Sequence, residues 1–121
     1  MNNKYIVAIA LLVIILAGGA LTIFLTSGNN DEVQLDAFAQ CLTQKGLVMY
    51  GTYFCSFCNE EKASFGSSFK FINYIECSKD IDKCLRENIT HTPAWIFPDG
   101  RKLVGKQGLQ KLSQETGCPL P

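Results

Sequence analysis

The residues best suited to chemistry are two cysteines, Cys55 and Cys58, in the segment GTYFCSFCNEEKASFG. A C-x-x-C spacing occurs in zinc sites, in small structural disulfides and in redox centres that exchange disulfides. An apolar run, LVMYG, precedes the pair, and the helix-forming segment CNEEKASF follows it. We therefore expect the two cysteines between a buried strand and the start of a helix.

This placement favours redox chemistry. The first turn of a helix has unpaired N–H groups and the positive end of the helix dipole, and both stabilise a thiolate. The thiolate is the nucleophile of disulfide exchange. We predict that Cys55 attacks the substrate and that Cys58, one turn further along, resolves the mixed disulfide. The prediction requires neither a metal nor another cofactor.

Three alternatives stay open at this level. Tetrahedral zinc needs four ligands, and the candidates to complete a site are Cys77, Cys84 and His91, whose spacing differs from that of common zinc modules. A purely structural disulfide between Cys55 and Cys58 would close a very small loop and remove little chain entropy. The third alternative is a non-catalytic binding module on the same scaffold.

The elements that must position the pair follow a long apolar stretch, residues 5–26, which has no charged residue. As a helix it would measure roughly 33 Å, enough to cross a hydrocarbon core of about 30 Å. We predict a transmembrane anchor over 5–26, and a cleaved signal peptide is the alternative. Lys4 is the only positive charge before it, which places the tail 1–4 in the cytoplasm.

The rest of the chain is expected to form a linker, 27–32, and one domain, 33–121. Beyond the apolar stretch ten Lys and Arg oppose eleven Asp and Glu, so no basic patch suggests nucleic acid. All six cysteines lie in the domain, as expected where disulfides persist. We predict a single-pass cell-membrane protein whose domain lies outside the cytoplasm, in the periplasm or at the cell exterior, and is monomeric.

The hydrophobic pattern of the domain predicts the order helix, strand, helix, strand, helix, strand, strand, helix. A strand–helix–strand unit favours a parallel pair, and a hairpin around the turn PDGR adds antiparallel strands. The expected fold is an α/β sandwich with a mixed sheet of about four strands flanked by helices. The segments concerned are 33–46, 47–51, 58–65, 69–77, 79–88, 91–97, 102–106 and 108–118.

The other four cysteines are predicted to form structural disulfides. Cys41 lies on the first helix of the domain and Cys118 follows the last, and the two helices can pack side by side. Cys77 and Cys84 would then form a second bridge. Six cysteines allow 15 connectivities, so only geometry can choose among them. A relay of electrons between Cys77–Cys84 and the C-x-x-C pair is the alternative role for the second bridge.

The segments VMYGTYFCSFC, TPAWIFPDGRKLVG and GLQKLSQETGC together resemble a thioredoxin-fold thiol–disulfide oxidoreductase. Within that fold, residues 35–118 are most similar to the thioredoxin-like domain associated with vitamin K epoxide reductase homologues. The resemblance implies exchange with the thiols and disulfides of exported proteins. It also implies a quinone-linked membrane reductase of that type as the redox partner.

The resemblance implies further site residues. Pro93 matches the family's cis-proline, which faces the C-x-x-C pair, and Thr92 would line the same substrate groove. Phe54 stands where many relatives have tryptophan and preserves an apolar cover, and Phe57 stands where histidine is common. Because Phe57 cannot stabilise a thiolate as a histidine would, we predict a less oxidising pair than in the strongest disulfide donors.

Two groups near the pair receive a simpler interpretation. Glu60 and Glu61 follow the motif in the first turns of the helix, and we expect them to be solvated acids that complement the helix dipole. His91, the only histidine, is next to Pro93. We expect it to be a solvated loop residue rather than a group that tunes Cys55.

Overall fold

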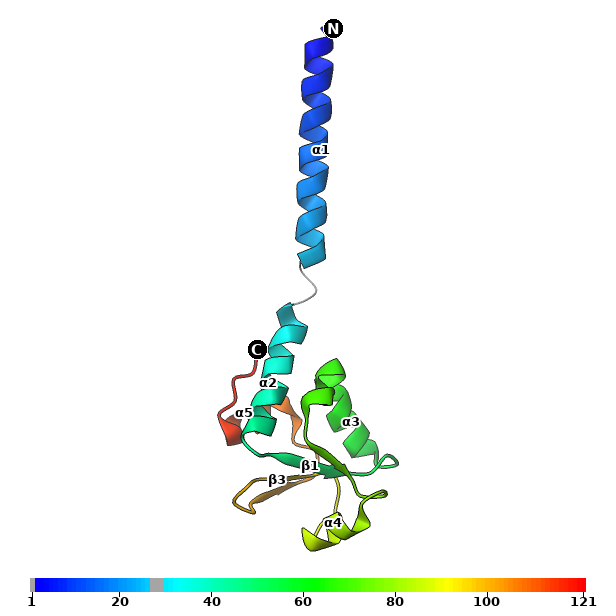
Figure 1. Ribbon diagram of the computed structural model, residues 1–121, viewed down its shortest axis with the longest axis vertical. Coiled ribbons are helices and arrows are strands. Elements are labelled where there is room, and N and C mark those ends of the chain that lie inside the picture. Colours follow the sequence, from blue (N-terminus) through cyan, green and yellow to red (C-terminus); the bar gives the residue numbers. More distant parts are fainter. Residues whose placement is uncertain (1, 27–29) are drawn as a thin grey trace. The chain divides into compact units, whose positions relative to one another are not determined.

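The structure is a computed structural model of the chain, in which residues 2–26 and 30–121 are described. Side chains are described for residues 2–16 and 35–121. The chain divides into two compact units, Met1–Asp31 and Glu32–Pro121. Figure 1 shows the elements of both units.

The first unit contains one helix, α1 (Asn3–Thr26). Among the described residues no helix is both long enough and apolar enough to cross a membrane. The predicted single-pass anchor over 5–26 is therefore not supported, and the localisation inferred from it is wrong.

The predicted linker, 27–32, has two parts. Residues 27–29 lie outside the described residues. Residues 30–32 belong to α2 (Asn30–Gln44), which therefore begins earlier than the helix predicted from residue 33.

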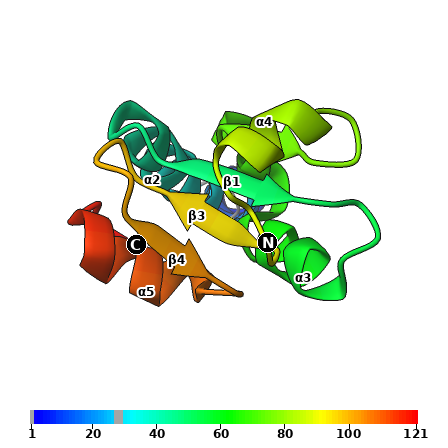
Figure 2. The ribbon, with the colours of Figure 1, turned by 90° about the horizontal axis from the view of Figure 1, so that it is seen from below.

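The second unit is built on a four-stranded sheet with the strand order β2-β1-β3-β4. The central strand β1 (Val48–Gly51) pairs in parallel with β2 (Tyr74–Glu76). It pairs antiparallel with β3 (Ala94–Ile96), which forms a hairpin with β4 (Lys102–Val104). Figure 2 shows strands β1, β3 and β4 in front of helices α2 and α5. The prediction of an α/β fold with a mixed four-stranded sheet is confirmed.

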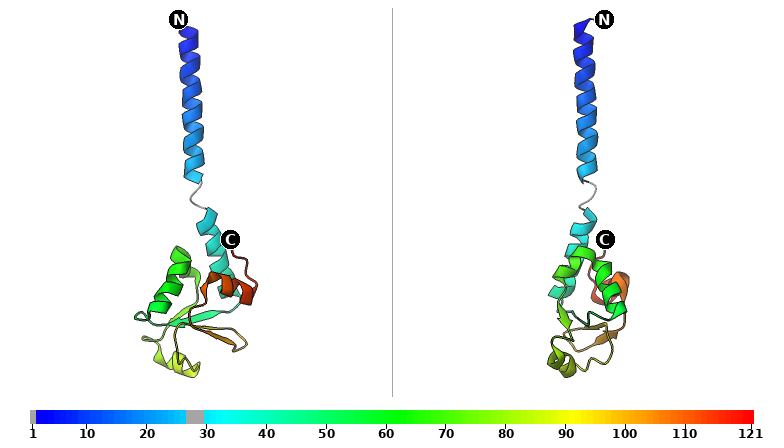
Figure 3. Two further views of the ribbon diagram at one scale, coloured as in Figure 1. Left: turned by 180° about the vertical axis from the view of Figure 1, so that it is seen from behind. Right: turned by 90° about the vertical axis from the view of Figure 1, so that its right-hand side faces the viewer.

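Helices cover the sheet unequally. On one face lie α2, α3 (Ser56–Phe65) and α5 (Gly108–Thr116), whereas α4 (Ile81–Arg86) lies on the other, as the views in Figures 1 and 3 agree. The last helix ends at Gly117, whose φ of 72° is a left-handed conformation that glycine adopts without strain.

The larger core lies on the three-helix face. Trp95, Phe65 and Phe38 are fully buried there, and the Phe65 ring centroid lies 6.0 Å from that of Trp95 and 6.1 Å from that of Phe38. A smaller core on the α4 face contains Tyr50 and Cys84. Because successive strand residues point to opposite faces, Trp95 belongs to one core and its neighbours to the other.

One predicted strand is much shorter than expected. The apolar segment 69–77 was predicted to be extended, but its first part belongs to a 3₁₀ helix, Gly66–Phe71, and only Tyr74–Glu76 is a strand. The reason is tertiary packing, because Phe69 lies against the rings of Phe65 and Tyr74. The compact turn also buries Ser68, whose hydroxyl donates to Asp36 at 2.6 Å.

Candidate functional site

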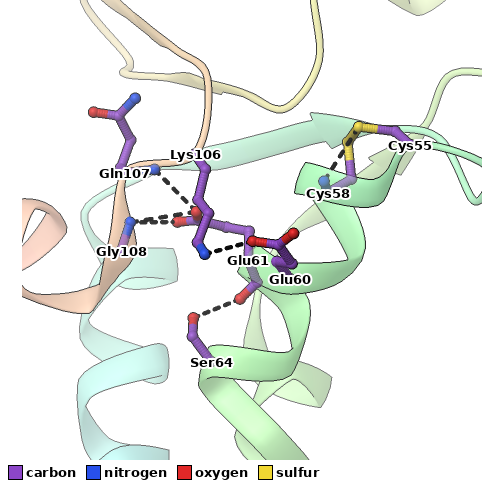
Figure 4. Close-up of polar contacts among 8 residues, drawn as sticks. All are labelled: Cys55, Cys58, Glu60, Glu61, Ser64, Lys106, Gln107 and Gly108. Atoms are coloured by element: carbon purple, nitrogen blue, oxygen red, sulfur yellow. Dashed lines mark hydrogen bonds and ion pairs between the residues drawn. A yellow bond between two sulfur atoms is a disulfide. The ribbon is translucent and has the colours of Figure 1, made fainter.

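The two cysteines of the motif form a disulfide at the start of α3, with their Cα atoms 5.2 Å apart. Cys55 is the N-cap residue, and the backbone N–H of Cys58 donates to its sulfur at 3.2 Å. Figure 4 shows this hydrogen bond. Cys55 is half-buried and Cys58 is 0% exposed. Cys55 is therefore the sulfur that a second molecule can reach.

The loop before β3 faces Cys55. The peptide bond between Thr92 and Pro93 is cis, as the resemblance implies, and Pro93 is buried. The sulfur of Cys55 lies 3.6 Å from the carbonyl oxygen of Thr92. This brings together two segments that are far apart in the sequence, one with the reactive sulfur and one with a backbone acceptor for its thiol form.

Three exposed aromatic side chains belong to the same short segment as the two cysteines. Tyr53, Phe54 and Phe57 are 68%, 70% and 59% exposed. The rings of Tyr53 and Phe54 meet edge to face with their centroids 5.1 Å apart. Large apolar groups this exposed indicate a contact surface when they gather at one place. Phe54 and Phe57, predicted from the sequence as substrate-binding residues, are thus accessible to a partner.

The structure joins the other cysteines in the predicted pairs. Cys41 on α2 is bonded to Cys118 after α5, with Cα atoms 5.9 Å apart. Cys77 after β2 is bonded to Cys84 on α4, with Cα atoms 5.7 Å apart. The first bridge lies in the core of the three-helix face, and the second fastens α4 to the opposite face.

Glu61 differs from the sequence-based expectation. It is 0% exposed, because it lies on the buried face of α3 with Cys58 and Phe65, at i+3 and i−4 from them. Its carboxylate accepts the backbone N–H of Gln107 at 2.9 Å and that of Gly108 at 3.1 Å (Figure 4). The expected solvated acid is therefore an internal link between α3 and the loop before α5.

Burial raises the pKa of Glu61, and the N–H groups of Gly108 and Gln107 oppose that rise. The indole N–H of Trp95 also lowers this pKa, although it forms no hydrogen bond of regular geometry among the described residues. Of the available signals, only the helical spacing from Cys58 to Phe65 could have identified Glu61 as buried.

Glu60 and His91 agree with their simpler interpretation. Glu60 is exposed and pairs with Lys106 at 2.7 Å, as Figure 4 shows. His91 is exposed, and its Nδ1 lies 3.1 Å from the hydroxyl oxygen of Thr90. Across the described part of the chain no group of three or more His, Cys, Asp or Glu residues is arranged to hold a metal ion.

Comparison with known proteins shows a similarity to a named enzyme. No protein-family model matches the chain. The chain is 36% identical over 93 residues to thiol-disulfide oxidoreductase LTO1 of Arabidopsis thaliana, an alignment that covers 69% of this chain. The same alignment covers 24% of LTO1, so the chain spans about a quarter of that relative. This similarity supports a thiol–disulfide oxidoreductase.

Proposed function

We propose that the protein is a thiol–disulfide oxidoreductase whose activity resides in a thioredoxin-like domain, residues 33–121, acting as a monomer. The observation that carries the proposal is the asymmetry of the Cys55–Cys58 disulfide. One sulfur caps a helix and is accessible, whereas the other is fully buried one turn later. The similarity to a named thiol-disulfide oxidoreductase supports the same reaction.

The local geometry suits an attacking and a resolving sulfur. In the reduced pair, the Cys58 N–H and the start of α3 stabilise a thiolate at Cys55. This thiolate attacks one sulfur of a substrate disulfide, the substrate bond breaks, and a mixed disulfide forms. Cys58 then attacks Cys55, which releases the second substrate sulfur and restores the Cys55–Cys58 bond. The reverse sequence oxidises a substrate dithiol.

The surroundings suit a polypeptide substrate. We propose that Phe54 and Phe57 contact apolar residues beside the substrate cysteine, because both rings are exposed next to Cys55. Thr92 and Pro93 would line the other side of the same groove, and the 3.6 Å distance from Cys55 to the Thr92 carbonyl supports this placement. In this proposal the bridges Cys41–Cys118 and Cys77–Cys84 are structural.

A redox partner must reset the pair after each turnover. The residue-level resemblance of 35–118 to domains associated with vitamin K epoxide reductase homologues motivates one proposal, a quinone-linked thiol oxidoreductase of that class. The reoxidation rate of the reduced protein should then rise on adding such an enzyme with quinone, and should not rise on adding either alone.

The first test is the reduction potential of Cys55–Cys58, measured by equilibration with glutathione buffers and thiol trapping. A potential between about −120 and −200 mV would indicate an oxidase or isomerase, whereas one near about −270 mV would indicate a reductant. Because position 57 is phenylalanine, we expect a potential clearly below the about −120 mV of the strongest donors. Absence of any redox transition at this pair would refute the proposed function.

Two serine variants separate the roles of the sulfurs. Cys55→Ser should abolish disulfide exchange, because it removes the accessible nucleophile. Cys58→Ser should accumulate a mixed disulfide with substrate, because the resolving sulfur is missing. Mass spectrometry of trapped intermediates distinguishes them. Equal trapping by both variants would contradict the assignment of Cys55 as the attacking residue.

A further inference from the structure

The buried sulfur of Cys58 has a polar neighbour that the reaction described above does not use. Gly51 ends β1 and pairs with Glu76 in the parallel ladder, while Met49 pairs with Tyr74. Residues two apart on a strand share a face, so Gly51, Tyr74 and Glu76 lie on one face of the sheet. Cys58 contacts that same face from α3.

Because Gly51 has no side chain, the sulfur of Cys58 and the phenol of Tyr74 can both lie close to its backbone. A Cβ atom built on Gly51 would lie 3.1 Å from the sulfur of Cys58 and 3.2 Å from the hydroxyl oxygen of Tyr74. Both atoms thus border the same small space beside the Gly51 backbone. The sulfur of Cys58 and the hydroxyl oxygen of Tyr74 are thus separated by at most the sum of these two distances. A direct contact or one bridging water can span such a gap.

The proton of the Tyr74 hydroxyl is already engaged. It is donated to Oε2 of Glu76 at 2.7 Å. Burial, followed by the hydrogen bond and charge of Glu76, raises the pKa of Tyr74. The phenol is therefore neutral at physiological pH, and its hydroxyl oxygen has only lone pairs to offer another neighbour.

Glu76 is held as the carboxylate. Its Oε1 accepts the Ser78 hydroxyl at 2.6 Å and the backbone N–H of Tyr53 at 3.2 Å. Partial burial acts to raise the pKa of Glu76, but the hydrogen bonds from Ser78, Tyr74 and Tyr53 outweigh it and lower that pKa. A negative charge therefore stays within one hydrogen bond of the hydroxyl beside Cys58.

We propose that Tyr74 and Glu76 are positioning residues that keep Cys58 protonated in the reduced pair and so reserve the thiolate for Cys55. A Cys58 thiol can donate its S–H to the lone pairs of Tyr74, whereas a Cys58 thiolate would face those lone pairs and the charge of Glu76. Cys55 differs from Cys58 because its sulfur has an N–H donor, that of Cys58 at 3.2 Å, in addition to the more distant Thr92 carbonyl at 3.6 Å. This inference rests on the proposed function.

The two sulfurs then differ in each chemical step. The Cys55 thiolate attacks the substrate disulfide, and one substrate sulfur leaves with the bonding electron pair as a thiolate. Cys58 next gives up its proton and attacks Cys55, the bond from Cys55 to substrate breaks, and the second substrate sulfur leaves carrying that proton. The substrate disulfide is reduced to one thiolate and one thiol, and the Cys55–Cys58 dithiol is oxidised. Tyr74 and Glu76 thereby lengthen the life of the mixed disulfide.

Other titratable groups lie on the elements packed around Cys58. Glu61 follows it on α3, but its carboxylate is bound to the N–H groups of Gln107 and Gly108. Lys62, also on α3, lies 3.9 Å from the centroid of the Tyr74 ring and contributes a positive charge of opposite effect. Lys106, from the loop after β4, is paired with Glu60 at the surface.

The test is a separate pH titration of Cys55 and Cys58 in the reduced protein. The ¹³Cβ chemical shifts of labelled cysteines report the protonation of each sulfur. Glu76→Gln removes the negative charge and weakens the acceptor that holds the phenol proton, so the thiolate fraction of Cys58 near neutral pH should rise at least about threefold. Tyr74→Phe should move it in the same direction. Glu60→Gln is the matched control, because it removes an exposed carboxylate two residues after Cys58. It should leave the titration of both cysteines unchanged.

A kinetic readout accompanies the titration. Cys55 joined to glutathione should release it faster in Glu76→Gln than in the unmodified chain, with the pH profile moved to lower pH. Unchanged Cys58 titration in both variants, or a shift of Cys55 as large as that of Cys58, would overturn the inference. A Cys58 shift in Glu61→Gln alone would also overturn it and assign the effect to the other carboxylate. If the unmodified chain exchanges no disulfide at all, the proposed function is refuted instead. The two failures can be told apart, because the titration does not depend on turnover.

Discussion

Two disulfides of this domain differ in where they lie in the fold and in the sequence separation of their cysteines. Cys55–Cys58 spans 3 positions at the start of a helix, and exposed aromatic rings adjoin it. Cys41–Cys118 spans 77 positions and connects α2 to the segment after α5, where Cys118 is only 1% exposed. The short bridge lies within one helix turn and constrains the unfolded chain little, whereas the long bridge joins two distant segments and constrains the unfolded chain strongly.

The comparison teaches that the position of a bridge relative to the helices, more than the burial of its cysteines, indicates its role. The third bridge, Cys77–Cys84, spans 7 positions and lies between these extremes. It fastens α4, the helix on the face opposite α3, and Cys84 is buried. Like the long bridge, it ties a helix to a segment outside that helix, whereas Cys55–Cys58 lies within one helix turn, so we expect it to act on stability rather than on turnover.

The largest expected effect on stability comes from removing the long bridge. The double variant Cys41→Ala/Cys118→Ala should lose about 4 kcal/mol of unfolding free energy, because its unfolded chain is freed from a long loop. Chemical denaturation measures the loss. The folded fraction should keep the exchange rate of the unmodified domain, and a lower rate per folded molecule would mean that this bridge also shapes the site.

Removing the intermediate bridge should cost less. The double variant Cys77→Ala/Cys84→Ala should lose about 2.4 kcal/mol, since the loop it closes is short. Turnover with a protein disulfide, measured at a temperature where the variant is folded, should be unchanged. A drop in turnover, with Cys55–Cys58 still able to react with glutathione, would favour the relay of electrons through Cys77–Cys84 instead.

The pH dependence of stability should report the buried carboxyl of Glu61. Its pKa is raised on folding, so its contribution to stability is fully present below the pKa of the unfolded chain. That contribution is lost as pH rises through the raised pKa of the folded state. The free energy of unfolding should therefore fall over this range, and Glu61→Gln should flatten the fall. Glu60→Gln is the control, and an identical change in both variants would contradict this assignment.

The smallest effect is expected from the aromatic rim. Phe57→Ser should raise the KM for a protein substrate about threefold to tenfold, because it removes an apolar contact, and should leave the reaction with glutathione unchanged. Leu85→Ser is the matched control, since Leu85 is 66% exposed on α4, on the other face of the sheet. If both variants change KM equally, the rim has no special role in binding substrate.

Local patterns in the sequence predicted much of the fold. The apolar runs and the turn PDGR identified the strands β1, β3 and β4, and Gly117 ended the last helix as expected. These features depend on neighbours within a few residues, which is why they can be read from the chain alone. The position of the C-x-x-C pair at the start of α3 was predicted from the local pattern in the same way.

Two of the predictions that failed concern whole segments of the chain. The segment 69–77 has the composition of a strand, but packing of Phe69 against Phe65 and Tyr74 makes its first part a compact turn. The apolar stretch 5–26 was predicted to span a membrane, and no helix in the described residues is long and apolar enough to do so. In the segment 69–77, composition over a short window overestimated the length of the strand.

The sequence by itself determined the reactive motif, the alternation of helices and strands, and the excess of cysteines. Only the tertiary structure decided which cysteines pair, that Glu61 is buried, and that Gly51 places Cys58 beside Tyr74. The physical reason is that these features join residues far apart in the chain or depend on which helix face meets the sheet. Local propensity has no access to such contacts, because they are created when strands pair and helices pack.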